Sequence, residues 1–396
     1  MRSSCYLPLL FIALLGGAAH AGEWSGEVGL EGRHFPHEPL DPRQHGDNLS
    51  LTVRPEYYHD WDDGNQRFAV TPYLRLDQGD SERTHFDLRE LYWRKSFESA
   101  EFRLGVRTVF WGVTESQHLV DIINQTDLVE NIDTEDKLGQ PMAQLTWLKD
   151  WGTLDFFLMP YFRERTLPGV EGRPRLPLVV DTDNPVFESS AEEKHLDFAV
   201  RYSHFIGIFD LGVAHFSGTS RDPRLVPTLR PTSELVLTPS YDLIDQTSLD
   251  LQATTGDWLW KLELISRDTP LGRYAAATGG FEYTLVGLFG TALDLGLLAE
   301  YLYDDRGDDA DTAFQDDVFL GTRLAFNDEQ STDLLLGVIV DADSRARFFN
   351  AEGSRRIGQS WRLSLEVRIL SDVPEEDLLF GLRNDDYWQL ELSKFF

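Results

Sequence analysis

The sequence predicts an all-β protein, a transmembrane antiparallel β-barrel. Three observations lead to this fold class. Apolar and polar residues alternate along most of the 396 residues, with the period of two that is typical of strands. The alternating segments recur at lengths of about 10 residues, which a tilted strand needs to cross a bilayer. The connections between them alternate between very short and long, as in membrane barrels.

Residues 1–21 have the composition of a secretory signal peptide. A positive residue near the start is followed by an apolar run at 6–15 and a small-x-small cleavage site at 19–21. The apolar run is shorter than the roughly 20 residues of a membrane-spanning helix. We therefore expect 1–21 to be removed on export and 22–396 to form the barrel. The single cysteine, Cys5, lies in the signal, which leaves no disulfide or thiolate site in the mature chain.

Each strand has one apolar and one polar face. The pattern is clearest near the C-terminus, where apolar residues at 361, 363, 365, 367 and 369 alternate with Arg362, Ser364, Glu366 and Arg368. A soluble sandwich and a membrane barrel both produce this pattern, but the export signal and the strand lengths favour the barrel. One apolar stretch, 285–303, could instead be a membrane helix. It contains two carboxylates and three glycines, and two strands around a turn at 288–290 fit it better.

Counting the alternating segments gives about eighteen strands, an even number as expected for bacterial barrels. Sixteen is the alternative, because 345–356 is weakly apolar and 84–96 loses its parity after Arg89, as at a β-bulge. The expected strands are 24–34, 47–59, 65–77, 84–96, 100–111, 139–148, 152–164, 194–205, 207–217, 242–255, 257–267, 275–286, 291–303, 314–326, 332–342, 345–356, 360–370 and 385–396.

The connections predict the orientation of the barrel. Short turns fall at 62–65, 149–152, 206–207, 255–257 and 357–358, and long connections fall at 112–138, 165–193, 218–241, 304–313 and 371–384. The two kinds alternate correctly if both termini face the periplasm, which places the long loops outside the cell. Aromatic rings favour the headgroup level of a bilayer, and we expect two girdles. Their members are Trp24, Tyr57, Tyr58, Trp61, Trp93, Trp111, Trp147, Trp151, Trp258 and Trp388.

The last predicted strand ends the chain on Phe396. A terminal phenylalanine after an alternating strand resembles the signal by which the barrel-assembly machinery of Gram-negative outer membranes recognises its substrates. Two further runs, Arg89-Glu90-Leu91-Tyr92-Trp93 and Arg103-Leu104-Gly105-Val106-Arg107, are followed by Trp111-Gly112. They resemble a pattern in alginate-export-type and related substrate-specific porins. The resemblance is confined to 89–112, so it implies the architecture more than the substrate. It implies an outer-membrane barrel in contact with lipid and lipopolysaccharide.

Strand parity assigns twelve basic residues to the pore-lining face: Arg54, Arg67, Arg75, Arg89, Arg103, Arg107, Arg201, Lys261, Arg267, Arg323, Arg362 and Arg368. Acidic residues on the same face nearly balance them, so most of the net charge of −31 lies outside the wall. Two interpretations remain open. The arginines form either a ladder that guides an acidic solute or an ion-pair network that holds the wall. Arg103 and Arg107 are the best ladder candidates, because they share one face of a strand that leads into a long irregular segment.

That segment, 113–138, is too apolar for a solvated loop, and long loops without a function are uncommon. We expect it to fold into the barrel as a constriction loop that narrows the pore, with Asp121, Glu130 and Asp133 among its charged residues. The alternative is a folded extracellular cap. Two dense acidic runs near 304–317 and 372–386 could attract divalent cations, but a solvated loop explains them as well.

These features predict a porin-type channel for passive diffusion of small hydrophilic solutes, with anionic solutes among the candidates. A non-conducting barrel with a surface-structural or adhesive role is the alternative. A hydrolase is a weaker one, because His195, His204 and His215 lie near Ser203 and Ser217 without any nucleophile-elbow or metal-ligand motif. We expect no enzyme activity, metal or cofactor. The net negative charge argues against nucleic acid as a partner.

Overall fold

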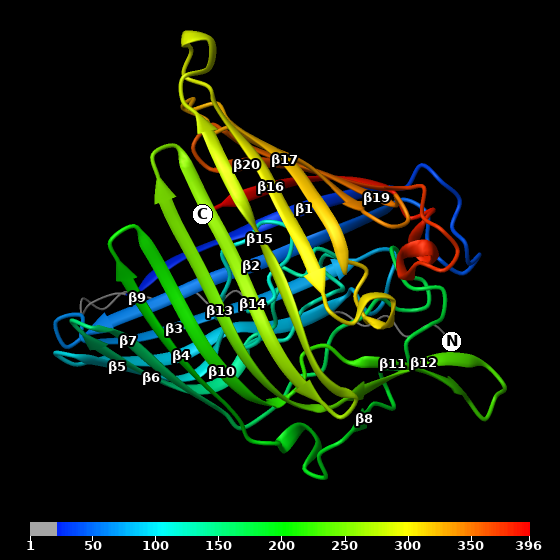
Figure 1. Cartoon of the computed structure of the whole chain (residues 1–396), viewed down its shortest axis with the longest axis horizontal. Coiled ribbons are helices and arrows are strands. Elements are labelled where there is room, and N and C mark those ends of the chain that lie inside the picture. The colour runs from blue at the N-terminus through cyan, green and yellow to red at the C-terminus, as the bar shows by residue number, and fades with distance from the viewer. Residues whose placement is uncertain (1–21) are drawn as a thin grey trace, which may run out of the picture.

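The computed structural model describes residues 22–396, and the predicted signal peptide lies outside the described residues. Eighteen antiparallel strands form one sheet, and the first strand, β1, pairs with the last, β21, so that the sheet closes into a barrel (Figure 1). The predicted fold class and strand number are therefore confirmed. No described helix is long and apolar enough to cross a membrane.

The strands of the barrel are β1 (Glu23–His34), β2 (Asn48–Trp61), β3 (Gln66–Asp77), β4 (His85–Ser96), β5 (Ala100–Arg107), β6 (Gln140–Lys149), β7 (Gly152–Met159), β9 (Asp197–Ile206), β10 (Phe209–Thr219), β13 (Leu243–Thr255), β14 (Trp258–Thr269), β15 (Gly272–Leu285), β16 (Asp294–Asp304), β17 (Asp316–Ala325), β18 (Asp333–Asp341), β19 (Arg347–Ile357), β20 (Trp361–Ser371) and β21 (Tyr387–Phe395). Consecutive members of this series are hydrogen-bonded neighbours.

Three further strands lie outside the barrel wall. They are β8 (Val186–Phe187), β11 (Arg224–Leu229) and β12 (Leu235–Tyr241), and they form a separate small sheet. The sequence prediction treated these stretches as parts of loops, because each strand is short, and β8 pairs with β12 more than 50 residues away. The helical segments of the described chain are four single 3-10 turns: η1 (Glu192–Lys194), η2 (Leu288–Gly290), η3 (Gly307–Asp309) and η4 (Leu378–Leu382). The turn η2 joins β15 to β16, so the apolar stretch 285–303 forms two strands, as expected.

The connections divide the barrel into two ends. At the turn end lie both ends of the described chain and the tight turns 62–65, 97–99, 150–151, 207–208, 256–257 and 358–360. At the loop end lie the connections 35–47, 108–139, 160–196, 220–242, 305–315 and 372–386. The predicted alternation holds for most connections, but 286–293 and 326–332 at the turn end are longer than tight turns, and 78–84, 270–271 and 342–346 at the loop end are short.

The outer face of the barrel is apolar. Leu30, Leu104 and Leu320 are at least half exposed, although they lie in the middle of strands. Exposed tryptophans near the turn end include Trp24, Trp147, Trp151, Trp258, Trp260 and Trp361. Trp388 is exposed near the loop end. An apolar belt with aromatic side chains at its edges matches the hydrocarbon core and headgroup region of a bilayer. The assignment of Trp111 to a girdle was wrong, because this side chain is 6% exposed and lies inside the barrel.

The predicted bulge in β4 is confirmed. Thr71 of β3 pairs with Glu90, but its neighbour Pro72 pairs with Leu88, so Arg89 is an extra residue without a partner across the ladder. Proline has no N–H to donate, and a bulge opposite it loses little hydrogen bonding. The extra residue shifts the parity of the strand, and consequently both Arg89 and Glu90 face the interior.

Candidate functional site inside the barrel

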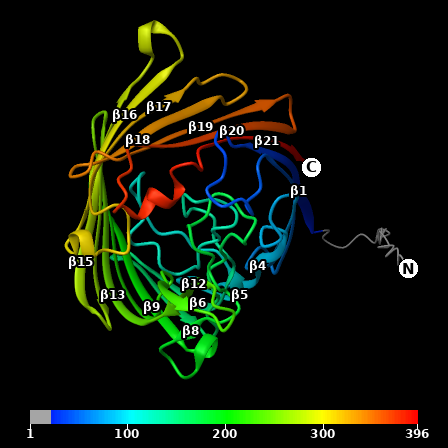
Figure 2. The ribbon, with the colours of Figure 1, turned by 90° about the vertical axis from the view of Figure 1, so that its right-hand side faces the viewer.

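The connection between β5 and β6, residues 108–139, lies within the ring of strands, and we call it the inner loop. Figure 2 looks into the barrel from the loop end and shows this teal segment inside the ring. The inner loop contacts well-separated parts of the wall. Val113 donates its N–H to Glu263 of β14 over 2.7 Å, and the Asn131 side chain donates to Glu366 of β20 over 2.9 Å.

One side of the inner loop is apolar and packs on an apolar part of the inner wall. Trp111, Val120, Ile122 and Ile123 are at most 6% exposed and cluster with inward residues of β6, β7, β9, β10, β13, β14 and β15. The wall residues are Met142, Phe157, Met159, Ala199, Ala214, Phe216, Ile244, Ile265, Tyr274 and Ala276. Burial of a large aliphatic side chain stabilises a fold by about 1.5–3 kcal/mol. The three aliphatic loop residues, Val120, Ile122 and Ile123, therefore together stabilise the packed position of the inner loop by about 5–9 kcal/mol.

Two wall carboxylates hold the backbone of the inner loop. Glu263, which is fully buried, accepts the N–H of Val113 (2.7 Å), the N–H and hydroxyl of Thr114 (3.1 and 2.7 Å) and the N–H of Val120 (3.2 Å). The inner loop has little regular structure, and its N–H groups lack a ladder to join. A carboxylate that accepts several of them satisfies these donors in the absence of bulk water.

The second wall carboxylate is Glu300 of β16. It accepts the N–H of Glu115 over 2.8 Å and both the N–H and the hydroxyl of Ser116, over 2.8 and 2.6 Å. The carboxylate of Glu115 in turn forms ion pairs with Arg323 at 2.7 Å and Lys261 at 3.5 Å. The first half of the inner loop is thus fixed to three adjacent regions of the wall.

His118 adds a charge to this half of the inner loop. Its Nδ1 lies 3.9 Å from Glu263, and its Nε2 lies 3.9 Å from Glu135. Burial alone would lower the pKa of the imidazole, but the two carboxylates outweigh burial and raise the pKa of His118 to about 9. The side chain is therefore cationic at neutral pH and is attracted to both carboxylates.

The second half of the inner loop is held by buried arginines. Arg75 of β3 binds Glu130 at 2.5 Å and Glu31 of β1 at 2.9 Å, and the Tyr73 hydroxyl donates to Glu130 over 2.7 Å. Arg83 donates to the carbonyl of Val129 over 2.7 Å. Breaking a buried ion pair by removing one partner costs about 3–5 kcal/mol, so these contacts fix the loop strongly.

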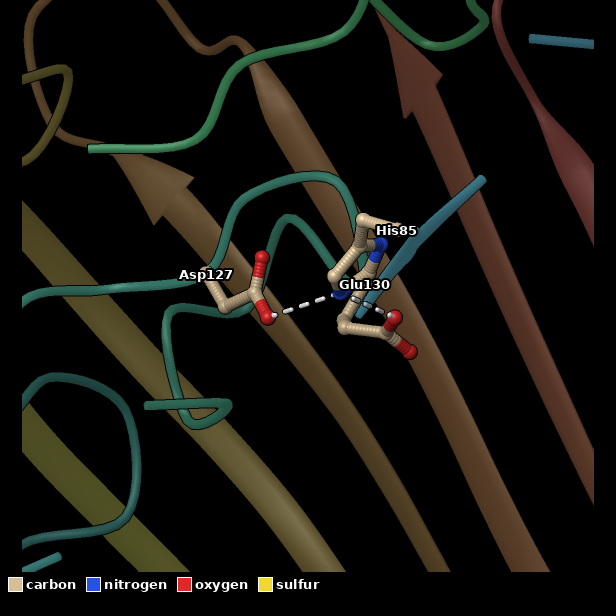
Figure 3. Close-up of side chains that lie close together, drawn as sticks. All are labelled: His85, Asp127 and Glu130. Carbon is tan, nitrogen blue, oxygen red and sulfur yellow. Dashed lines mark ion pairs between the residues drawn. The ribbon is translucent and has the colours of Figure 1, made fainter. Parts of the chain in front are cut away.

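His85 of β4 lies between two carboxylates of the inner loop (Figure 3). Its Nε2 is 3.4 Å from both Asp127 and Glu130. These three side chains are close enough to share a metal ion. However, Arg89 already binds Asp127 at 2.6 Å and Arg75 binds Glu130. Two guanidinium groups at the same carboxylates would repel a cation, so the arrangement is better described as an ion-pair network.

Most of the predicted pore-lining basic residues have carboxylate partners. Ten of the twelve lie within 4.0 Å of an acidic group of the described chain: Arg54, Arg67, Arg75, Arg89, Arg103, Arg201, Lys261, Arg267, Arg323 and Arg368. The other two lie over aromatic rings. Arg107 is 5.1 Å from the ring centroid of Tyr92, and Arg362 is 5.5 Å from that of Phe395.

Several of the residues that carried the family resemblance lie on the inner face of β4 and β5. Tyr92 lies opposite Gly105, with Arg103 and Arg107 on either side of that glycine. Gly105 has φ of +141°, and a Cβ atom there would lie 2.1 Å from the Leu91 carbonyl oxygen. Glycine is therefore required at this position, and it lets Tyr92 support the guanidinium of Arg107. Arg103 pairs with Glu101 instead.

The three predicted constriction residues lie in different environments. Asp121 is buried within the inner loop, where it accepts the N–H of Trp111 over 3.2 Å and pairs with Lys137 at 3.1 Å. Glu130 is buried against Arg75. Asp133 retains 22% exposure of its side chain and pairs with Arg368 at 3.3 Å. Of the three, Asp133 alone presents an appreciable surface to the lumen.

A polar cavity of about 370 Å³ remains between the inner loop and the wall formed by β1–β4 and β18–β21. The acidic residues that line it are Glu27, Glu31, Glu130, Asp136, Asp333, Glu352, Glu366 and Glu391. Restricted solvation and the nearby Glu130 raise the pKa of Asp136 to about 7. Burial and Glu366 raise the pKa of Asp133, close by, to about 7 as well.

The anchoring roles of Glu263 and Glu300 could not be predicted from the sequence. Parity placed Glu263 on the polar face, but many inward carboxylates share that property. The apolar inner wall left a weak signal, since Phe157 interrupts the alternation between Phe156 and Leu158. The suggested hydrolase residues are not brought together. No hydrogen bond among residues 22–396 joins His195, His204 or His215 to Ser203 or Ser217.

No protein-family model and no curated protein matches this sequence. Among solved structures, one reported as asymmetric conductivity of engineered proteins is 12% identical, with a TM-score of 0.47, and the match covers 95% of this chain and 100% of that chain. Two mutants of the Rhodopseudomonas blastica porin are 13% and 11% identical, with TM-scores of 0.47 and 0.46 and the same coverage. The strands themselves define the architecture. A closed ring of eighteen antiparallel strands, apolar outside and charged inside, is the architecture of a porin-type outer-membrane barrel.

Proposed function

We propose that this chain is a channel through which small hydrophilic solutes diffuse passively across the outer membrane. The observation that carries the proposal is the combination of an apolar outer belt, a closed ring of strands and a charged lumen with a polar cavity of about 370 Å³. A non-conducting barrel would not need so many charged groups on its inner face, because charged groups are costly to bury without partners.

The direction of the barrel follows from its two ends. In bacterial barrels the short turns face the periplasm and the long loops face outward, so the loop end would be extracellular. Residues 1–21 would direct export, and the wall would contact lipid and lipopolysaccharide. The last residue has a direct part in closure, because Phe396 and Gly26 exchange two backbone hydrogen bonds of 3.1 Å. This position supports recognition of the C-terminal strand by the barrel-assembly machinery.

The inner loop would act as the constriction. Its contacts with β1, β3, β4, β14, β16 and β20 support this role over that of an external cap. The arginine ladder has less support, because ten of the twelve basic residues are paired with carboxylates. The ladder can still be tested at Arg103 and Arg107, the two positions that the sequence favoured. Unchanged ion selectivity after Arg103→Ala and Arg107→Ala would reject a ladder at these positions.

The decisive experiment is conductance of the refolded protein in a planar bilayer. We expect stepwise currents that increase with salt concentration. A control sample that has been denatured and not refolded should give no steps. If correctly folded barrels remain electrically silent, the inner loop is a plug, and the non-conducting surface-structural barrel becomes the better explanation.

A further inference from the structure

The inner loop divides the lumen unequally. Its apolar side chains occupy the half of the barrel interior lined by β6–β15. The polar cavity lies in the other half, against β1–β4 and β18–β21. Water and ions that move through the barrel would therefore follow one side of the wall, and the charges on that side decide which ions enter. This inference rests on the proposed channel function.

The charge of this cavity is strongly negative. Eight carboxyl groups and three guanidinium groups line it, a formal excess of five negative charges once Asp136, whose pKa is raised to about 7, is ionised. The guanidinium groups are already engaged. Arg54 pairs with Glu27 at 2.8 Å, Arg75 pairs with two glutamates, and Arg89 pairs with Asp127. None of the three is left to attract an anion strongly.

Several of the carboxylates lack a basic partner. Within the described chain, Asp136, Asp333 and Glu391 have no basic group within 4.0 Å, although Ser354 donates to Asp333 and Ser393 donates to Glu391, each over 2.8 Å. Arg368 is shared among Glu352, Glu366 and Asp133. One guanidinium cannot neutralise three carboxylates, so this wall keeps a negative potential.

The loop end carries charge of the same sign beside this half of the barrel. The acidic connection 372–386 joins β20 to β21, two of the strands that line the cavity. Clefts lined by one sign of charge concentrate ions of the opposite sign, because low-dielectric walls focus the field. A cation that enters from the loop end would meet these carboxylates before it reaches the cavity.

We propose that the open side of the lumen selects cations, taking small inorganic cations and small amine-bearing solutes in preference to anions, and that Asp136, Asp333 and Glu391 set this preference. The effect differs from simple size exclusion. Potassium and chloride are similar in size, so a size filter would pass them equally, whereas a negative cavity favours potassium.

The test is the reversal potential of single channels in a potassium chloride gradient. We expect a potassium-to-chloride permeability ratio clearly above one and on the order of ten, the lower limit of enrichment for strongly charged clefts. The ratio should fall toward one at high salt, because the Debye length shortens from about 10 Å at 0.1 M to about 3 Å at 1 M. A ratio at or below one overturns the inference while the channel itself stands. The absence of any current refutes the channel function instead.

The residues are tested by the triple variant Asp136→Asn, Asp333→Asn and Glu391→Gln. The amides keep the size of the side chains and can still accept from the serine hydroxyls. We expect at least a halving of the permeability ratio with little change in conductance. An unchanged ratio would overturn the assignment of these residues.

A matched control changes the same number of charges outside the lumen. Asp63, Glu98 and Asp150 lie in tight turns at the turn end, are exposed, and form no ion pair within the described chain. The variant Asp63→Asn, Glu98→Gln and Asp150→Asn should keep the ratio of the unmodified protein. An equal loss of selectivity in both triple variants would show that net charge, and not the cavity, sets the preference.

Discussion

Replacing Glu263 with alanine should loosen the first half of the inner loop and raise the conductance of the channel. The carboxylate accepts three backbone N–H groups and one hydroxyl from residues 113–120. A hydrogen bond to a charged group is worth about 1.5–3 kcal/mol, and removing one partner from a buried charged cluster costs about 3–5 kcal/mol. His118 would also lose one of its two carboxylates.

The stabilisation that remains in the variant decides what kind of change to expect. The apolar contacts of the inner loop contribute about 5–9 kcal/mol and remain intact in the variant. The loop should therefore stay in the barrel, while residues 113–120 become mobile. Single-channel recordings should show a higher mean conductance and larger fluctuations of the open current. The double variant Glu263→Ala and Glu300→Ala should show a greater effect, because both carboxylate anchors are then missing.

A control variant separates this effect from a general change in lumen charge. Glu282 of β15 lies between the strands that carry the two anchors, and it contacts Lys261 and Arg323 rather than the inner loop. Glu282→Ala should leave the open-current fluctuations unchanged. If the double anchor variant is folded and conducts like the unmodified protein, the first half of the inner loop does not limit the passage, and the reasoning is refuted.

Three further predictions concern the same loop and its partners. Deleting 116–134 should raise single-channel conductance, and an unchanged conductance would mean that the loop does not constrict the pore. Arg368→Ala leaves three carboxylates without their shared partner and should destabilise the barrel by about 3–5 kcal/mol, measured as a lower denaturant midpoint of the refolded protein in detergent; an unaltered midpoint would contradict this. The carboxyls of Asp133 and Asp136 have pKa values raised to about 7, so the folded state holds protons that the unfolded state releases, and their stabilising effect is lost as the pH rises from about 4 to 7. The pKa of His118 is raised to about 9, so its contribution is complete below about pH 6.5 and is lost as the pH rises through 9. Both effects predict that open-current fluctuations increase with pH, and a profile that is flat from pH 5 to 9 would contradict them.

The wall of the barrel could be predicted from the sequence because its determinants are local. Alternation with a period of two identifies each strand and its two faces, and even the bulge at Arg89 left a shift of parity next to Pro72. The position of Trp111 was misjudged for the same reason. Its place beside a predicted strand end suggested a girdle, but a contact with Phe157 on the inner wall depends on how a distant segment packs.

The candidate site could be predicted only in part. The apolar content of residues 113–138 suggested a loop inside the barrel, because such a segment cannot remain in water. Parity also placed the basic residues on the inner face. It could not show that most of them face carboxylates, nor that Glu263 and Glu300 hold the loop. These contacts join residues more than 140 positions apart, and one sequence carries no record of such pairs.

The seam of the barrel sets the order in which the molecule can be completed. β1 and β21 are neighbours in the ring, although almost the whole described chain separates them. Such a pairing has the largest sequence separation that the chain allows, and contacts of this kind form slowly. Residues 23–34 must wait with an unpaired edge until the last ten residues are delivered, and an unpaired edge readily joins the wrong partner. The unclosed barrel is therefore prone to mispairing and aggregation until β21 joins β1.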